Sequence, residues 1–425
     1  MSEEKSLFEQ IVEQDKIDKL KDKDESKWEE EIEIALLSKT IDLPKVKEIC
    51  NLYLYMPDDG IVDFILAVYL SNFTAGERLW TWFVGPPSVG KTELLRALVS
   101  DASILKDSLT ANTLFSGLRI GGKDPSLFRR INRKVLIIKD FTKILSDQEE
   151  NLTAILGQLR CAYDGYYNAS TGAEDKDYHY ETNFTLIAGV TPAIDDHYSI
   201  RQQLGERFLS WRIENIDREK LLSKVKENRN KKDKMRMDLR RNFGAFIKKY
   251  RELKKQPEID DKMITKIGEL ADMITWARTP VPRFGYTREV RRIPEKEGSP
   301  RFFEQLLHLS MVLTLIRDKE KTTAAEYALI YKVALNSMLP ERILVIEAFF
   351  TLIEEAKKED FVTTEFWFET PQISDHINLP TQSARIILDD LFLLKILFRK
   401  GENPLLWHLD STFAEKWRFA KPAAV

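Results

Sequence analysis

The feature that most constrains this chain is the run Gly85-Pro86-Pro87-Ser88-Val89-Gly90-Lys91-Thr92-Glu93, whose first eight residues fit the pattern G-x4-G-K-[ST]. Phosphates are bound by backbone N–H groups that point inward, with a helix N-terminus behind them and small side chains around them. Gly85 and Gly90 permit that curvature, Lys91 can reach the β- and γ-phosphates, and the Thr92 hydroxyl can ligate Mg²⁺. Residues 85–93 therefore predict a site for a nucleoside triphosphate such as ATP, with Mg²⁺.

The surroundings of this loop predict a parallel α/β sheet. The apolar run Leu79 to Val84 leads into the loop as a strand, and a helix is expected from Thr92 onward. The runs Val135 to Ile138 and Phe184 to Val190 are too short for helices and fit buried parallel strands. Strands that alternate with helices favour a parallel sheet. Helices are expected before about residue 72 and again after residue 214.

Composition excludes several other classes. The chain has 425 residues, 43% of them hydrophobic and 31% charged, which suits two or three folded domains and not a disordered protein. Its 2 cysteines are too few for a disulfide scaffold or a zinc module built from cysteines, and its 5 histidines show no metal-ligand spacing. The start of the chain lacks the apolar region of a secretory signal, and no apolar stretch is long enough to span a membrane. We expect a soluble cytoplasmic protein.

An acidic residue follows the second predicted strand, in the run Lys139-Asp140-Phe141-Thr142. Enzymes that hydrolyse a triphosphate need one carboxylate for the Mg²⁺ shell and another to orient the attacking water. Two alignments are open. Either Asp140 serves the metal and Phe141 replaces the second acid, or Lys139 occupies the metal position and Asp140 orients water. Asp140 could also be a simple helix cap.

Five short runs in order resemble the motifs of AAA+ ATPases, and among them the minichromosome-maintenance-like helicase branch. They are GPPSVGKTELL, LIIKDFTKI, LIAGVTP, LGERFL and SPRFFEQLLHLS, within about residues 75–340. The resemblance favours Asp140 as the catalytic acid, with Lys139 in the place of an acid. It implies that Thr191 is the sensor 1 residue, Arg207 an arginine finger that acts on a neighbouring subunit, and Arg301 the sensor 2 residue, which contacts the nucleotide of its own chain. Lys139, Thr191 and His308 depart from the usual residues, and the overall impression is of a phage- or plasmid-type replication ATPase.

A hairpin is expected over residues 165–183, where tyrosines flank a Gly/Asp/Lys turn. In the resembled branch, a hairpin at this place grips DNA inside a ring. Lys176 near the tip would meet phosphate, and Tyr167 or Tyr178 could stack on a base. The acidic tip residues oppose such contact, so a plain surface hairpin is the alternative.

Charge is unevenly distributed along the chain. Residues 1–35 carry 13 acidic and 6 basic side chains, a net charge of −7, whereas residues 216–255 carry 16 basic and 6 acidic side chains, a net charge of +10. The basic stretch is either a solvated helix face, a phosphate-binding surface, or a docking site for the acidic arm of a neighbouring copy.

The last part of the chain predicts a winged helix, which either binds DNA or serves as a protein-docking or hinge module. A short helix, Thr370 to Ile377, is followed by a turn and by a candidate recognition helix, Thr381 to Leu394. Arg385 on that helix, with Arg399 and Lys400 in the wing, are the candidate DNA contacts. Cys50 and Cys161 are expected to be buried packing residues.

These expectations divide the chain into an acidic helical arm (1–35), an AAA+ α/β nucleotide-binding core (36–214), a helical lid with the basic segment (215–340) and a winged-helix domain (341–425). The leading hypothesis is a ring-forming, ATP-hydrolysing DNA motor of the replication-helicase type. A homo-oligomer such as a hexamer, DNA, and replication or mobile-element proteins are its expected partners. The alternatives are a DNA-bound ATP switch that does not translocate (an initiator, a loader or a transcription regulator), and a low-turnover ATP-binding scaffold of a mobile-element or defence complex.

Overall fold

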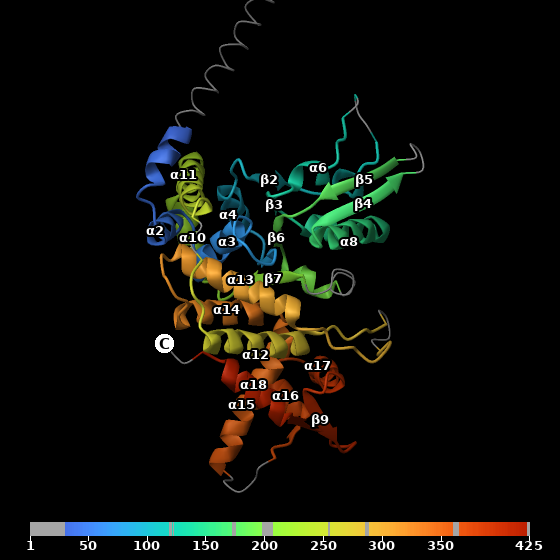
Figure 1. Ribbon diagram of the computed structural model, residues 1–425. Helices are drawn as coiled ribbons and strands as arrows, with labels where there is room; N and C mark the ends of the chain where they lie inside the picture. Colours follow the sequence, from blue (N-terminus) through green and yellow to red (C-terminus); the bar gives the residue numbers. More distant parts are fainter. Residues whose placement is uncertain are drawn as a thin grey trace, which may run out of the picture.

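A sheet of five parallel strands forms the centre of the molecule, in the order β2-β3-β6-β1-β7 (Figure 1). The computed structural model describes residues 30–118, 121, 123–171, 176–197, 207–253, 256–284, 289–359 and 365–422. The strands of the sheet are β1 (Trp80–Val84), β2 (Ser103–Lys106), β3 (Val135–Ile138), β6 (Thr185–Val190) and β7 (Phe208–Arg212). The prediction of a parallel α/β sheet is thereby confirmed.

The three strands expected from apolar runs are the central ones, β3, β6 and β1. Every residue of these strands is buried, as strands covered by helices on both faces require. The outer strands β2 and β7 were not predicted. β2 has the half-buried sequence Ser-Ile-Leu-Lys, and β7 ends in Ser-Trp-Arg, so neither forms a continuous aliphatic run. Their pairing with β3 and β1 makes them strands.

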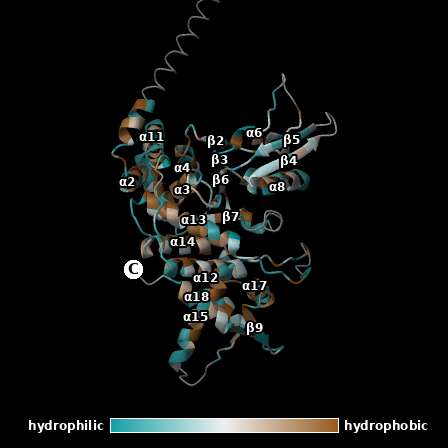
Figure 2. Ribbon diagram, viewed as in Figure 1, coloured by the Kyte–Doolittle hydropathy of each residue, from teal (hydrophilic) through white to brown (hydrophobic). Residues whose placement is uncertain are grey.

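Helices cover both faces of the sheet and make two separate cores. On one face, α2 (Leu43–Tyr53), α3 (Gly60–Ser71) and α4 (Lys91–Ala97) pack with the long helices that follow β7. The other face carries the short helices α5 (Ala111–Leu114), α6 (Phe128–Ile131) and α7 (Thr142–Leu145), and the longer α8 (Glu149–Tyr163). Figure 2 shows α3 largely in brown, which fits its almost completely buried sequence GIVDFILAVYLS.

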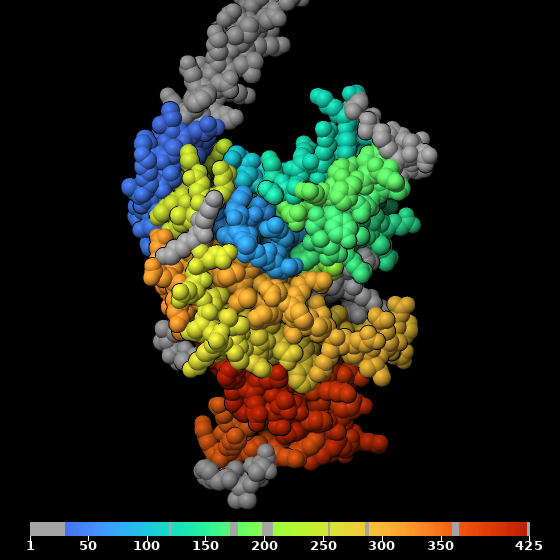
Figure 3. Space-filling model, in the orientation of Figure 1, coloured from blue at the N-terminus to red at the C-terminus, as the bar shows by residue number. Residues whose placement is uncertain are grey.

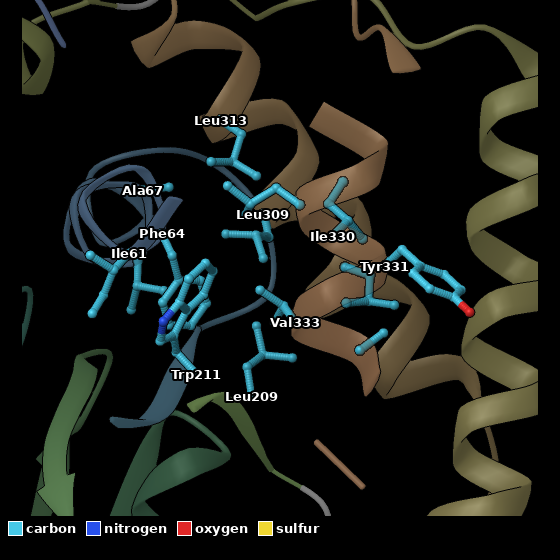
Figure 4. Packing of buried hydrophobic residues seen from close by; sticks show 14 of the residues in the cluster. Ile61, Phe64, Ala67, Leu209, Trp211, Leu309, Leu313, Ile330, Tyr331 and Val333 are labelled. Carbon is cyan, nitrogen blue, oxygen red and sulfur yellow. The ribbon is translucent and has the colours of Figure 1, made fainter. Parts of the chain in front are cut away.

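A helical region follows the sheet and packs directly on α3 and β7. Its helices are α10 (Arg218–Glu227), α11 (Lys232–Arg251), α12 (Asp261–Arg278), α13 (Pro300–Ile316) and α14 (Ala324–Asn336). Figure 4 shows Phe64 of α3 and Trp211 of β7 facing Leu309 of α13 and Val333 of α14. The Phe64 and Trp211 rings are stacked, with centroids 5.3 Å apart. Truncation of a side chain as buried as Phe64 costs about 3–5 kcal/mol.

Charges as well as apolar contacts hold this seam. Arg317, which follows α13, donates hydrogen bonds to Asp63 of α3 at 2.8 Å and to Glu326 of α14 at 2.8 Å. Lys47 pairs with Asp63, and Lys319 lies 2.8 Å from Glu326. Both carboxylate side chains are completely buried. Three cations thus neutralise two buried acids that join the sheet region to the helical region.

The expected hairpin is present as β4 (Tyr166–Thr171) and β5 (Lys176–Glu181), which pair antiparallel and project from the sheet beside α6 and α8 (Figure 1). Tyr167 on one of its faces packs on Phe128, with ring centroids 4.6 Å apart. The hairpin is therefore anchored by its inner aromatic face.

The C-terminal residues form a lobe at one end of the molecule, in red in Figure 3. Its elements are α15 (Pro340–Glu359), β8 (Phe368–Glu369), α16 (Thr370–His376), α17 (Thr381–Leu393), β9 (Leu397–Lys400), β10 (Leu406–Leu409) and α18 (Ser411–Ala420). The strands make a small antiparallel sheet in the order β8-β10-β9. The two helices predicted around residues 370–394 are present.

Within the described ranges, no helix is both long and apolar enough to cross a lipid bilayer.

Candidate nucleotide-binding site

The loop between β1 and α4 curves because two of its residues have left-handed backbone conformations, Ser88 (φ 66°) and Gly90 (φ 88°). Gly85, directly after β1, is buried against Ile213, and a Cβ atom at residue 85 would lie 3.1 Å from that side chain. The left-handed conformation favours glycine at residue 90, and the close approach of Ile213 favours it at residue 85. Lys91 and Thr92 begin α4, and the Thr92 side chain is exposed.

Lys91 points back into the loop that precedes it. Its ammonium donates hydrogen bonds to the carbonyl oxygens of Gly85 and Pro86, the latter at 2.6 Å. Burial lowers the pKa of Lys91 to about 8, while the carboxylate of Asp140 acts in the opposite direction. A phosphate group in the loop would favour the charged form in the same way as Asp140 does. The loop thus holds its cation in place, and Asp140 faces that cation.

Asp140 and Lys139 follow β3 but serve different neighbours. Lys139 forms an ion pair with Asp107, just after β2, so its charge is directed along the sheet edge toward β2. Asp140 is exposed, and its carboxylate accepts a hydrogen bond of 3.0 Å from the Thr142 backbone N–H. Asp140 is not the N-cap of α7, which is Phe141; its carboxylate instead closes a turn onto the N–H two residues further on. This hydrogen bond orients a carboxylate that is also close enough to Lys91 to affect its pKa.

Thr191 links the end of β6 to the end of β3. Its backbone N–H donates to the Thr142 hydroxyl at 3.0 Å, and the Thr142 hydroxyl lies 3.3 Å from that of Thr191. Thr142, which sequence reasoning did not single out, thus contacts both Asp140 and Thr191. Lys91, Asp140, Thr142 and Thr191 all follow the carboxyl ends of adjacent strands, the edge where open α/β sheets bind ligands.

A cavity of about 650 Å³ adjoins the loop on the β7 side. Ile213, which touches Gly85, is one of its lining residues. The others are Met56, Pro57, Asp58, Asp59, Ile61, Trp211, Arg212, Glu214, Asn215 and Lys332. Cavities of this size accommodate small-molecule ligands. Sequence reasoning missed this cavity because its lining combines the segment before α3 with the end of β7 and α14.

Arg207 lies at the opposite edge of the sheet. Phe208 pairs with Trp80 and Arg212 with Val84, so Arg207 is level with Leu79 and not with Gly85. At the usual rise of a strand, this places Arg207 roughly 20 Å from the phosphate loop along the sheet. An arginine side chain does not extend that far, so Arg207 cannot reach the loop of its own chain.

Arg301 lies beside Arg207 and not beside Lys91. The guanidinium groups of Arg207 and Arg301 lie 5.3 Å and 5.7 Å from the centroid of the same ring, Tyr163 at the end of α8. Gln305 of α13 donates to the Tyr163 hydroxyl at 2.9 Å and to the Arg207 carbonyl at 2.7 Å. Burial and the nearby Arg301 lower the pKa of Arg207. The expected contact of Arg301 with the nucleotide of its own chain does not fit this placement.

Residues expected at a nucleic-acid surface have mixed placements. The side chain of Lys176 lies outside the described residues. Tyr167 and Tyr178 contact Phe115 beneath the hairpin, with centroids 5.6 Å and 5.4 Å apart. Tyr166, which is 53% exposed, is on the outward face instead. Alternation along the strand, applied to the pair Tyr166 and Tyr167, could have shown that one of the two must face inward.

The basic segment meets the acidic arm within one chain. Arg240 and Arg241 of α11 pair with Glu30 and Glu33 at 3.2 Å and 2.8 Å. Arg236 makes two hydrogen bonds, of 2.7 Å and 2.8 Å, with Glu93 of the phosphate-loop helix. Part of the charge on this segment is therefore used to hold α11 against α4 and residues 30–37.

In the C-terminal lobe, Arg385 and Arg399 share one carboxylate, each lying 3.1 Å from Asp389. Lys400 lies over the Trp367 ring, 3.9 Å from its centroid. Two of the three candidate DNA contacts are thus engaged in internal ion pairs.

The structure also places the two cysteines and His308. Cys50 is buried as expected, and burial raises its pKa to about 12. Cys161 is exposed, so its assignment to the core was wrong: it lies on the outer side of α8. His308 is a buried structural residue. Its Nδ1 donates to the Glu77 carbonyl at 2.6 Å, and its Nε2 accepts from the Thr74 hydroxyl at 2.7 Å.

No cluster of three or more His, Cys, Asp or Glu side chains that could hold a metal ion by itself occurs in the described part of the chain. Neither a protein-family model nor a curated protein matches this sequence.

Proposed function

We propose that this protein is an AAA+ ATPase that hydrolyses ATP at the interface between copies of itself and uses the cycle to act on DNA as a replication-type motor. One observation carries the proposal. The phosphate loop and two arginines suited to a γ-phosphate lie on opposite edges of one sheet, too far apart to meet in one chain. Two copies arranged head to tail would bring them together, and repetition of that contact produces a ring such as a hexamer.

The residues at the carboxyl edge fit a bound triphosphate with Mg²⁺. Ser88, Val89 and Gly90 of the loop offer backbone N–H groups. Lys91 supplies the cation for the phosphates, and Thr92 with Asp140 would hold the metal shell. Mg²⁺, when bound, neutralises charge on the phosphate oxygens. Asp140, oriented by Thr142, would also position the attacking water, and Thr191 supports that arrangement through the Thr142 hydroxyl.

Arg207 and Arg301 would both act on the nucleotide of the neighbouring subunit. An arginine stabilises the charge that develops in phosphoryl transfer through its planar set of donors. The Tyr163 ring lies beside both guanidinium groups at the end of α8, and Gln305 holds the Tyr163 hydroxyl and the Arg207 carbonyl, so the pair is organised before a neighbour docks. The reassignment of Arg301 to this edge is supported by its contact with the Tyr163 ring.

The C-terminal lobe is best interpreted as a winged helix. Helices α16 and α17 are followed by the antiparallel strands β9 and β10, which is the element order of that fold. It would place DNA at one end of the motor, whose other candidate contact is the projecting hairpin β4–β5.

A DNA-bound ATP switch is the second candidate, and Lys139 favours it. The ion pair with Asp107 leaves a cation at a strand end where an acid is expected for rapid turnover. A switch would bind ATP and assemble, but it would hydrolyse ATP slowly and would not separate strands.

The deciding experiment measures the ATPase rate at several protein concentrations, with and without single-stranded DNA. The variant Lys91→Ala is measured in parallel as the inactive control. A shared active site and a motor function predict a rate that rises with concentration and with DNA and is lost in Lys91→Ala. Slow turnover indifferent to DNA would favour the switch. A rate per subunit that is independent of concentration, in a protein that remains monomeric, would contradict the shared site.

A further inference from the structure

The small sheet of the C-terminal lobe has a row of aromatic side chains on its outward face. Its inward face is formed by buried residues such as Phe368, Trp407 and Leu397. Side chains alternate along a strand, so their neighbours Trp367, His408 and Phe398 point to the other face. The register pairs His408 with Phe398 and Trp407 with Phe368, which places Trp367, directly before β8, in line with His408 of β10 and Phe398 of β9.

The three rings form a continuous stack. The Trp367 and His408 rings are 5.1 Å apart with an interplanar angle of 30°, and the His408 and Phe398 rings are 6.3 Å apart at 20°. His408 is also fixed to the backbone, because its Nδ1 donates to the Phe366 carbonyl at 2.9 Å. The row is thus a rigid series of nearly parallel rings across β8, β10 and β9.

The two ends of the row differ. At one end the Trp367 ring is covered by Lys400, and its Nε1 donates to Glu365 at 3.4 Å. At the other end Phe398 lies on the edge strand β9 and is 48% exposed. A further flat ring can therefore join the stack at Phe398. Lys400 is two residues along the same strand and on the same face, and its ammonium lies over the Trp367 ring, so its positive charge is at the other end of the row from Phe398.

We propose that Phe398 is the platform on which an unpaired nucleobase of a nucleic-acid strand stacks, and that the strand follows the aromatic row so that one of its phosphates meets Lys400 at the Trp367 end. A flat aromatic ring linked to an anion is the chemistry that this combination fits. Base stacking on aromatic side chains is the usual source of affinity for single strands. Bases within a duplex already have both faces covered, so the platform selects unpaired bases or strand ends.

The platform shares Lys400 with the surface that the sequence predicts for this lobe, but not the two arginines. Arg385 of α17 and Arg399 of β9 both pair with Asp389 of α17, and Arg399 also covers the Phe392 ring at 4.2 Å. The aromatic row faces outward from the sheet and requires neither arginine. The inference rests on the proposed function only in taking nucleic acid as the partner.

The test is the affinity of the full-length protein for a fluorescent thymidine 20-mer and for a duplex of the same length, measured by anisotropy. We expect Phe398→Ala to bind the single strand about tenfold more weakly, which corresponds to about 1.4 kcal/mol, and to bind the duplex almost unchanged. Phe398→Tyr keeps a ring and should retain the affinity. Phe419→Ala is the matched control, because Phe419 is 51% exposed on α18, outside the row.

A strand that carries one 5-bromouracil gives a direct readout, since photocrosslinking should label the peptide that contains residue 398 in the wild type. Wild-type affinity of Phe398→Ala for the single strand, or an equal loss for single strand and duplex, would overturn the platform. Failure of the proposed function has a different result: ATP hydrolysis that is absent in the wild type or unaffected by Lys91→Ala. ATPase activity without DNA should be the same in Phe398→Ala and wild type, which also shows that the variant is folded.

Discussion

The two edges of the central sheet are built in different ways. At the carboxyl edge, backbone geometry places the functional groups: a loop with left-handed residues holds Lys91, and a hydrogen bond from the Thr142 N–H orients Asp140. At the amino edge, side-chain packing does so, because Arg207 and Arg301 rest on the ring of Tyr163. The first edge is suited to hold a triphosphate within one chain, whereas the second is suited to meet a neighbour.

This difference makes each edge an incomplete site. The carboxyl edge has a cation for phosphate binding and an acid for water, but the arginines lie at the other end of the strands. If the two edges form one site between neighbouring subunits, a variant of the carboxyl edge and a variant of the amino edge should lose different properties. Mixing the two variants should restore part of the ATPase activity.

The largest effect is expected at the carboxyl edge. Lys91→Ala removes the cation from the phosphate loop and should lower the ATPase rate about 10³-fold together with ATP affinity. Measurement of ATP binding and steady-state hydrolysis checks this. Lys143→Ala, which removes an exposed lysine of α7, is the matched control and should behave as wild type. If Lys91→Ala bound ATP with normal affinity, the loop of residues 85–93 would not be part of the nucleotide-binding site.

The amino edge should lose hydrolysis and keep binding. Arg207→Ala is expected to lower the ATPase rate about 10²-fold while ATP affinity is retained, because the arginine acts only on a neighbour's nucleotide. Arg207→Lys serves as a second variant, because it retains a cation at this buried position and is therefore less prone to unfold than Arg207→Ala.

Mixing the two inactive variants sharpens the comparison. In an equimolar mixture of Lys91→Ala and Arg207→Ala, about a quarter of the interfaces combine an intact loop with an intact arginine, so activity should exceed that of either variant alone. If stable mixed oligomers remain inactive, the two edges do not share a site.

A smaller effect is expected from pH. Burial lowers the pKa of Lys91 to about 8, and a bound triphosphate favours its charged form. ATP affinity should therefore be complete below pH 8 and should fall as the pH rises above it, by at most about tenfold per pH unit because one proton is taken up. Titration calorimetry between pH 7 and pH 9.5 measures this. Lys91→Arg stays charged throughout and should show a flat profile.

The smallest effect concerns Lys139. Since its ammonium pairs with Asp107, whose side chain is 76% exposed, Lys139→Met should change the ATPase rate by less than roughly threefold, as expected for an ion pair with one solvated partner. Asp107→Asn should give the same result. A large increase in rate in Lys139→Met would instead show that this lysine restrains turnover, as the switch hypothesis requires.

The sequence predicted the parts of the molecule in which local rules decide the outcome. The aliphatic runs became the three central strands, and the hairpin and the helices around residues 370–394 are present. The strands β2 and β7 were not predicted, because their polar and aromatic residues become strand residues only when they pair with β3 and β1. Cys161 was assigned to the core although its helix presents it to solvent.

In the candidate site, the phosphate loop and Asp140 could be predicted from the sequence, because each directly follows a strand that an apolar run predicts. The meeting of Arg301 with Arg207 could not be predicted, since it depends on how α13 packs against α8, more than a hundred residues away in the chain. The pairing of Arg385 with Asp389 is an i,i+4 contact on one helix, so the spacing in the sequence could have shown it. The packing of Tyr167 on Phe128, in contrast, depends on long-range packing.

The ion network at the seam between α3 and α14 has a consequence for acid tolerance. The cations around Glu326 hold its pKa at about 2, below the 4.5 of an unperturbed glutamate. Its stabilising effect is therefore complete above about pH 4.5 and is lost as the pH falls toward 2. Protonation would leave Arg317 and Lys319 next to a neutral acid at the joint of the two regions. Acid should thus loosen the contact between the end of α13 and α14 before it affects the aliphatic strands β3 and β6, which carry no titratable side chains.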